Sequence, residues 1–170
     1  MSLPQRKKLR LEDYNYNENG AYFITIFTKN RQPILCNIVG TGVLDRPIKT
    51  ELLNCGKIAD KYVKQLNDFY KNISVDTYVI MPDHIHLLLQ IDNGQSGTPV
   101  PTYCGEKIDN KNSCIAKFVS TFKRFCNKEY GRNIWQTGYY DHVIRNFQDY
   151  IETFGYIENN PSNWFIKNNP

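Results

Sequence analysis

Two histidines lie two residues apart in the segment MPDHIHLLL, residues 81–89. Because side chains alternate across a strand, His84 and His86 are expected on one face of a strand over residues 84–91. The apolar residues that follow each of them are expected on the opposite face, in the core: Ile85, Leu87, Leu89 and Ile91. Two imidazoles side by side form half of a metal site.

The histidine pair alone leaves two interpretations open. A buried pair can serve only structure, through hydrogen bonds to its neighbours, or it can bind a metal ion. The pair does not identify the ion either, because zinc takes further nitrogen or sulfur ligands, whereas magnesium and manganese take oxygen and water.

A tyrosine near the C-terminus adds a second kind of chemistry. Glu152, Tyr156 and Asn160 recur every four residues, so a helix places them above one another on one face. If that helix docks on the histidine face of the sheet, Tyr156 comes near the pair, and Asn160 or Glu152 offers a third, oxygen ligand. A hydroxyl nucleophile beside a cation is suited to phosphoryl transfer. Packing is the alternative for any one of the twelve tyrosines.

The elements that must position these residues follow from periodicity and turn signals. Strands are predicted at 21–28, 74–80, 84–91 and within 134–144, and helices at 48–69, from Ser113 onward and at 147–160, where Pro161 ends the last helix. Residues 33–47 and 93–112 are expected to be loops, the second of them mobile. The order is β-α-β-β-α-β plus a C-terminal helix, an α+β, ferredoxin-like order with an antiparallel sheet and two helices on one face. The face with the histidines is left for the helix that carries the tyrosine.

Composition bounds the class of protein. The 170 residues are expected to form one domain, residues 1–170, and 41% of them are hydrophobic, which excludes a disordered chain. Five cysteines without a C-x-x-C pair favour reduced thiols and a cytoplasmic location over a disulfide framework or a zinc knuckle. We expect no signal peptide and no membrane partner, because no stretch approaches the roughly 20 apolar residues of a membrane span.

The net charge of +4 permits a polyanionic partner without requiring one. The basic residues gather in an N-terminal segment, residues 1–18, and along the helix that follows Ser113. A charge run can be only a solvated face, and the alternative is that these two clusters contact phosphates.

Several stretches of the chain resemble the single-tyrosine HUH transposases of small bacterial insertion sequences, and above all their REP-associated tyrosine transposase branch. They follow the family's order: NGAYFIT at 19–25, YVIMPDHIHLLL at 78–89, FVSTFK at 118–123, IWQ at 134–136, YYDHVIRN at 139–146 and YIENNP at 156–161. The second stretch contains the family's His-hydrophobic-His motif in its usual setting. That motif alone is weak evidence for the resemblance, whereas the whole set of stretches in the family's order is strong evidence.

The resemblance implies a metal ion and a nucleophile. In such enzymes two histidines and a polar residue one helical turn after the tyrosine hold Mg²⁺ or Mn²⁺, and these positions match His84, His86 and Asn160. The matching tyrosine, Tyr156, is expected to attack a phosphodiester of single-stranded DNA, which gives a 5′-phosphotyrosine and a free 3′-hydroxyl that can later rejoin. Insertion-sequence members often have glutamine at the position of Asn160. Tyr150, six residues earlier on the same predicted helix, is expected to face elsewhere, which makes it a backup nucleophile at best.

The resemblance also implies single-stranded or hairpin DNA as the partner. Phosphate contacts are expected from these residues: Arg6, Lys7, Lys8, Arg10, Lys117, Lys123, Arg124 and Arg145. Such contacts give affinity and salt dependence but no choice of sequence. Tyr139 and Tyr140 either stack on unpaired bases or pack in the core, and His142 is expected to have a structural or DNA-contacting role rather than to bind metal.

Two other functions remain open beside a DNA-cleaving and strand-joining transposase. One is a non-catalytic hairpin-DNA-binding protein derived from a transposase. The other is a metal-dependent nuclease that uses water and leaves no covalent adduct. The family includes both homodimers and monomers, so the resemblance leaves the oligomeric state open.

Overall fold

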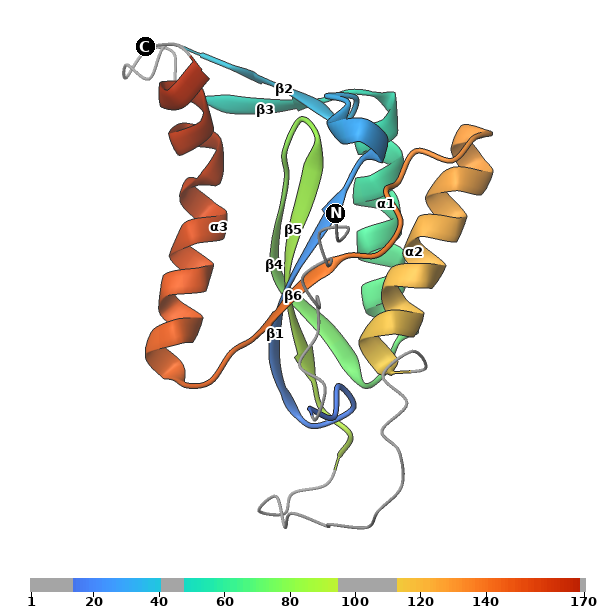
Figure 1. Ribbon diagram of the computed structural model, residues 1–170, viewed down its shortest axis with the longest axis vertical. Helices are drawn as coiled ribbons and strands as arrows, with labels where there is room; N and C mark the ends of the chain where they lie inside the picture. The colour runs from blue at the N-terminus through green and yellow to red at the C-terminus, as the bar shows by residue number, and fades with distance from the viewer. Residues whose placement is uncertain (1–13, 41–47, 95–112, 169–170) are drawn as a thin grey trace, which may run out of the picture.

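The structure, a computed structural model, describes residues 14–40, 48–94 and 113–168 (Figure 1). Its elements in chain order are β1 (Gly20–Phe27), the short 3-10 turn η1 (Lys29–Arg31), β2 (Cys36–Val39), β3 (Lys49–Leu52), α1 (Asn54–Phe69), β4 (Ile73–Ile80), β5 (His84–Ile91), α2 (Cys114–Tyr130), β6 (Tyr140–Val143) and α3 (Phe147–Asn168). Within the described ranges no helix is long and apolar enough to cross a membrane. The N-terminal residues Arg6, Lys7, Lys8 and Arg10, and the predicted loop from residue 95 to 112, lie outside the described residues.

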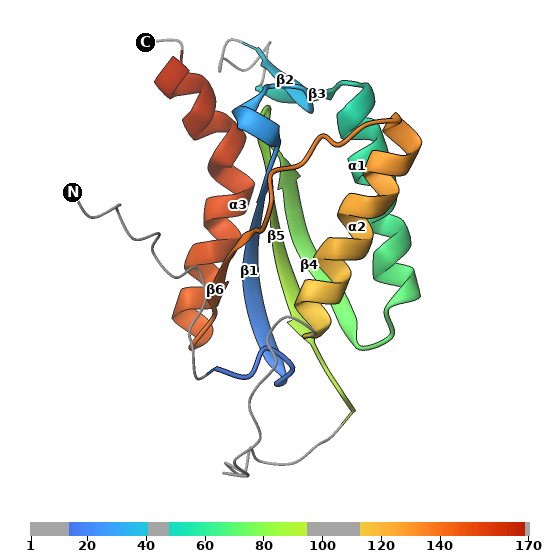
Figure 2. The same cartoon turned by 45° about the vertical axis from the view of Figure 1, so that its right-hand side comes forward.

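The main sheet has four strands in the order β4-β5-β1-β6, and every neighbouring pair is antiparallel. Helices α1 and α2 cover one face of this sheet, and α3 lies on the other (Figure 2). This arrangement confirms the predicted α+β, ferredoxin-like fold with an added C-terminal helix. It also confirms that the last helix occupies the face left open by the first two.

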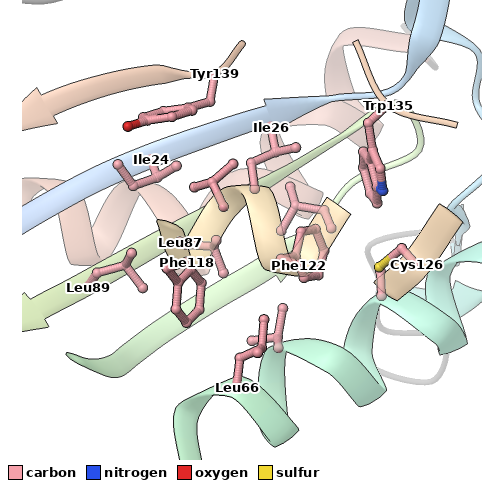
Figure 3. Packing of buried hydrophobic residues seen from close by; sticks show 14 of the residues in the cluster. Ile24, Ile26, Leu66, Leu87, Leu89, Phe118, Phe122, Cys126, Trp135 and Tyr139 are labelled. Atoms are coloured by element: carbon pink, nitrogen blue, oxygen red, sulfur yellow. The ribbon is translucent and has the colours of Figure 1, made fainter. Parts of the chain in front are cut away.

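The main core fills the space between the sheet and the α1–α2 layer (Figure 3). The four residues of β5 that alternate with the histidine face are all buried there: Ile85, Leu87, Leu89 and Ile91. They meet Phe118 and Phe122 of α2, which are fully buried as well. Alternation along β5 therefore directs His84 and His86 toward α3, as predicted.

Helix α2 begins where its sequence predicts. The Ser113 side chain accepts a hydrogen bond from the Ala116 backbone N–H at 3.3 Å, which caps the first turn. At the other end Gly131 takes the left-handed conformation, with φ at 82°, a conformation that glycine adopts without steric cost.

The predicted loop over residues 33–47 and the predicted helix over 48–69 are both corrected. Strands β2 and β3 pair as an antiparallel hairpin within these ranges, and α1 begins only at Asn54. Ile48 and Leu52 have helical spacing with α1, but both pack in the cluster around Met81, and Leu52 also borders the main core. Long-range packing therefore overrode the local pattern.

The predicted end of the last helix at Pro161 is also wrong, because α3 continues to Asn168. Proline removes one backbone donor from the helix interior and disfavours the helical region for the residue before it. The helix continues because Trp164 and Phe165, in its last turns, pack against Met81 and the β2–β3 hairpin. Partial burial of these two aromatic rings offsets the lost hydrogen bond.

Candidate functional site

The β4–β5 turn is fixed from two sides, and this fixes the histidine pair. Residues 81–83 connect the strands, and the Met81 N–H donates to the His84 carbonyl at 2.8 Å. The Thr28 N–H donates to the Asp83 carbonyl at 2.9 Å, and the Leu35 N–H donates to the Pro82 carbonyl at 3.0 Å. The start of β5 is therefore tied to the end of β1 and to the segment before β2.

The two imidazoles face each other through their Nε2 atoms, which lie 3.0 Å apart. The outer nitrogens have partners of their own: Asp83 Oδ1 lies 2.6 Å from His84 Nδ1, and Thr25 Oγ1 lies 2.9 Å from His86 Nδ1. Because a carboxylate only accepts, His84 Nδ1 donates, and its Nε2 presents a lone pair. Such outer partners orient histidines that bind metal.

Burial keeps both imidazoles neutral. It lowers the pKa of His86 to about 3, with a further decrease from the neighbouring His84. It also lowers the pKa of His84, although the Asp83 carboxylate acts in the opposite direction. Neutral imidazole is the form of histidine that can bind a metal ion.

Low pH is expected to destabilise the fold through His86. The unfolded chain binds a proton at His86 below its ordinary pKa of 6.5, whereas the folded chain does so only near pH 3. The contribution of His86 to the free energy of unfolding is complete above pH 6.5 and is lost as the pH falls toward 3. With chelator present, the His86→Asn variant should lose less stability between pH 6.5 and 5 in urea unfolding, by up to about 1.4 kcal/mol per pH unit. Parallel curves for the two proteins would contradict this.

Tyr156 lies beside the histidine pair within the same chain. Its ring centroid is 5.3 Å from that of His86 and 6.0 Å from that of Phe23. The side chain is 50% exposed, and within the described ranges its hydroxyl has no hydrogen-bond partner. A substrate can therefore approach this oxygen from solvent.

Contacts with the sheet position the tyrosine. Ile157, the next residue along α3, is fully buried against Ala21 and Leu88. Two side chains of α3 bond to β4, one six residues before Tyr156 and one two residues after it: Tyr150 donates to Asp76 at 2.9 Å, and Glu158 accepts from Thr77 at 3.2 Å. Tyr150 is thus engaged away from the histidines.

Asn160, the third predicted ligand, follows Tyr156 by four residues on α3. It is buried, with 8% exposed, and its side-chain amide has no hydrogen-bond partner in the described part of the chain. The alternative, Glu152, is exposed and accepts a hydrogen bond from Gln148 at 2.8 Å. Among the described residues, no group of three or more histidine, cysteine, aspartate or glutamate side chains is arranged to hold a metal ion. Imidazole nitrogens can bind several divalent ions, and an amide oxygen with water would suit the remaining positions of magnesium or manganese.

The basic residues of α2 lie away from this site. Lys117 and Arg124 are exposed on a helix that covers the opposite face of the sheet (Figure 2). Lys123 donates to the Gln136 carbonyl at 2.7 Å and to the Gly138 carbonyl, and burial lowers its pKa to about 8. Its role in the structure is to hold the segment before β6.

Strand β6 and its connection to α3 carry the two remaining predicted residues, His142 in the strand and Arg145 after it. His142 Nε2 lies 3.0 Å from Asp149 Oδ2, and the Arg145 N–H donates to the same oxygen at 3.0 Å. These bonds, the backbone bond first, lower the pKa of Asp149 and fix the start of α3. His142 thus has a structural contact, while the Arg145 side chain is exposed beside it.

Sequence reasoning missed the partners of the histidines. Asp83 precedes His84 directly, and Thr25 is paired with His86 in the β1–β5 register, so strand pairing could have indicated both. Arg31 was also missed: its guanidinium lies 3.4 Å from Asp83 Oδ2. Only the fold of the turn after β1 reveals that contact.

Comparison with known proteins gives the chain its relatives. No family model matches it. A protein of Haemophilus influenzae described as uncharacterized is 29% identical over 168 residues, which cover 94% of this chain and 89% of that protein. The REP-associated tyrosine transposase of Escherichia coli is 24% identical over 146 residues, which cover 86% of this chain and 68% of that protein.

A solved structure of a REP-associated tyrosine transposase bound to a REP hairpin has the same fold. The superposition has a TM-score of 0.58 at 18% identity, and it covers 96% of this chain and 74% of the other. Sequence and fold thus agree with the resemblance that the motifs indicate: the chain is a relative of the REP-associated tyrosine transposases.

Proposed function

We propose that this protein is a transposase that cleaves and rejoins single strands of DNA through Tyr156. The observation that carries the proposal is the position of Tyr156. Its side chain is half exposed, and its ring centroid lies 5.3 Å from that of His86, whose Nε2 atom faces the Nε2 atom of His84. The relatives support it, because one bears the name REP-associated tyrosine transposase and a protein of that name was solved with a REP hairpin.

The ion expected here is Mg²⁺ or Mn²⁺, and His84, His86 and Asn160 would hold it. When bound, it would neutralise charge on the scissile phosphate. Asp83 and Thr25 keep the two imidazoles in orientation through their Nδ1 atoms. The neutral state of both histidines follows from their burial.

The chain's own chemistry is the attack of the Tyr156 oxygen on phosphorus. The bond from phosphorus to the 3′ oxygen breaks as the new bond to Tyr156 forms. The phenol proton passes to solvent, which reaches the half-exposed side chain, and the leaving 3′ oxygen takes up a proton. The product is a 5′-phosphotyrosine and a 3′-hydroxyl, and reversal with another strand rejoins DNA without ATP.

The substrate proposed is hairpin DNA with a single-stranded flank. The purified protein is incubated with such a DNA, labelled on its 5′ end or its 3′ end, in Mn²⁺ and in chelator. A covalent protein–DNA band on a denaturing gel, formed only with the 3′-labelled strand and with metal, supports the transferase. Cut DNA without this band favours the water-using nuclease, and binding without cleavage favours the non-catalytic DNA-binding protein.

The double variant His84→Ala/His86→Ala separates metal-dependent chemistry from binding. It should stop cleavage under both enzymatic hypotheses and leave binding of the DNA within a few fold, because phosphate contacts by basic residues supply most of the affinity. Cleavage that survives the double variant would remove the histidine pair from the mechanism.

A further inference from the structure

The turn after β1 has an unusual backbone. Asn30 has φ at 56° and ψ at 26°, and Arg31 has φ at 53°, so two successive residues with side chains take the left-handed conformation. Residues other than glycine avoid this conformation unless the surrounding structure enforces it, and such residues cluster at functional sites. Here the Thr28 hydroxyl donates to the Gln32 carbonyl at 2.8 Å, and the Lys29 N–H donates to the Ile134 carbonyl at 2.8 Å.

The consequence of this turn is the position of the Arg31 guanidinium. Its central carbon lies 3.3 Å from the centroid of the Phe27 ring. Its Nη1 lies 3.4 Å from Asp83 Oδ2, and the other oxygen of that carboxylate holds His84. After burial and nearer partners, the Arg31 charge is a further cause that lowers the pKa of both histidines. The guanidinium is thus one carboxylate away from the proposed metal ligands.

Most of the hydrogen-bonding capacity of Arg31 remains for a ligand. The side chain is 54% exposed, and its hydrogen bond to Asp83 uses one nitrogen at a long distance. Guanidinium carries five N–H groups in a planar arrangement that matches a phosphate. Structure alone gives little reason for the strained turn, since an exposed ion pair of this kind contributes little to stability.

An exposed aromatic ring continues the same surface. The Phe27 ring centroid is 5.5 Å from that of His84 and 5.5 Å from that of Tyr140. Tyr140 is paired with Thr25 in the β1–β6 register, which puts its side chain on the histidine face, and it is 47% exposed. Tyr139 is the opposite case, buried in the main core. Helix α3 packs on β4 and β5, and it leaves Tyr140 at the open edge.

We propose that Arg31 and Tyr140 bind the DNA strand beside the cleavage site. Arg31 binds a backbone phosphate in the flank, held flat by the Phe27 ring, and Tyr140 stacks on the unpaired base next to that phosphate. Phosphate binding by guanidinium and stacking on an exposed aromatic ring are the two contacts by which proteins hold single strands. The inference rests on the proposed function, and it assigns to this chain the residues that position the strand.

Binding without cleavage tests Arg31. The affinity of the Tyr156→Phe protein for fluorescent hairpin DNA with a single-stranded flank is measured over a range of salt concentrations. Adding Arg31→Gln should weaken binding about tenfold at low salt and reduce the slope of log K against log salt by about 0.7, the loss of one phosphate contact. Arg31→Lys should recover the slope, because the charge returns.

Arg132→Gln is the matched control. Arg132 also lies over an aromatic ring, 5.3 Å from the Tyr130 centroid, at the end of α2. It should leave affinity within twofold and the slope unchanged. If Arg31→Gln and Arg132→Gln weaken binding equally, the effect is that of net charge and the inference is overturned. The same holds if Arg31→Gln leaves both quantities unchanged.

A fluorescent base tests Tyr140. The base analogue 2-aminopurine is placed at successive positions of the flank, and stacking quenches its fluorescence. At one position of the flank, the unchanged protein should quench the fluorescence of 2-aminopurine. Tyr140→Phe, which keeps the ring, should quench it as well, and Tyr140→Leu should not. Quenching that persists in Tyr140→Leu would overturn this contact. Neither measurement needs cleavage, so both contacts can be found even if the protein cuts no strand. An adduct at Tyr156 together with unchanged DNA binding by Arg31→Gln would overturn only the role of Arg31 and leave the proposed function in place.

Discussion

Replacing Tyr156 with phenylalanine is expected to abolish strand cleavage and covalent attachment while DNA binding stays within twofold. The substitution removes only the hydroxyl, which has no hydrogen-bond partner among the described residues, and keeps the ring against His86 and Phe23. Loss of the attacking atom should reduce the rate at least about a thousandfold. Single-turnover cleavage of labelled hairpin DNA measures the rate, and thermal unfolding should show an unchanged Tm.

Tyr150→Phe is the matched control for that variant. It removes a tyrosine hydroxyl from the same helix, but this hydroxyl donates to Asp76 of β4. A small loss of stability, about 1 kcal/mol or less, and nearly unchanged cleavage are expected. If cleavage survives Tyr156→Phe and disappears in Tyr150→Phe, Tyr150 is the nucleophile and the proposal for Tyr156 is wrong.

Gly56→Ala is expected to destabilise the fold more than any other small substitution discussed for this chain. A Cβ at Gly56, in the first turn of α1, would lie 2.0 Å from the Leu35 carbonyl oxygen and 3.0 Å from its carbon. Both are backbone atoms, and that oxygen accepts from the Leu53 N–H at 2.9 Å. The helix must therefore move away from Leu35, which costs roughly 3 kcal/mol or more and lowers the Tm by roughly 8 °C.

Gly155→Ala provides the comparison, since it makes the same substitution in the interior of α3. A Cβ at Gly155 would meet no atom within 4 Å. Alanine is the better helix former, so this variant should be more stable by about 0.5–1 kcal/mol. Urea unfolding of the two variants gives the difference directly. Destabilisation of similar size in both would show that close approach to Leu35 is not the cause.

The sequence was most informative where local pattern and packing agree. Alternation along β5 predicted both the buried residues and the face of His84 and His86, because that strand is buried on one side for its whole length. The four-residue spacing along α3 placed Tyr156 and Asn160 on the face that meets the sheet. It left Glu152 open as a ligand, and only burial separates the two candidates: Asn160 is buried, whereas Glu152 is exposed.

Sequence patterns predicted wrong bounds for helices where contacts between residues far apart in the chain determine the structure. Ile48 and Leu52 continue the helical spacing of α1, yet their packing around Met81 makes them part of the β2–β3 hairpin region. Pro161 is a strong local signal for a helix end, and the packing of the partly buried Trp164 and Phe165 overrides it. No spacing rule relates these residues to Met81.

The pattern of charge along the sequence did not predict where the basic side chains lie in the fold. Lysines and arginines along α2 share a helix face, but the pattern does not say which side of the sheet that helix covers. Lys123 was expected to contact phosphates, and in the structure it bonds to two backbone carbonyls. Arg31 belongs to neither of the two basic clusters in the sequence, and the strained turn that brings it to Asp83 is visible only in the structure.

Identifying the residue that is joined to DNA decides whether Tyr156 is the nucleophile. Protein incubated with hairpin DNA and Mn²⁺ is digested with nuclease and protease, and the peptides are analysed by mass spectrometry. We expect a nucleotide attached through its 5′-phosphate to the peptide that contains Tyr156, and to no other. Cut DNA that carries a free 5′-phosphate, with every peptide unmodified, would contradict the proposal and favour attack by water.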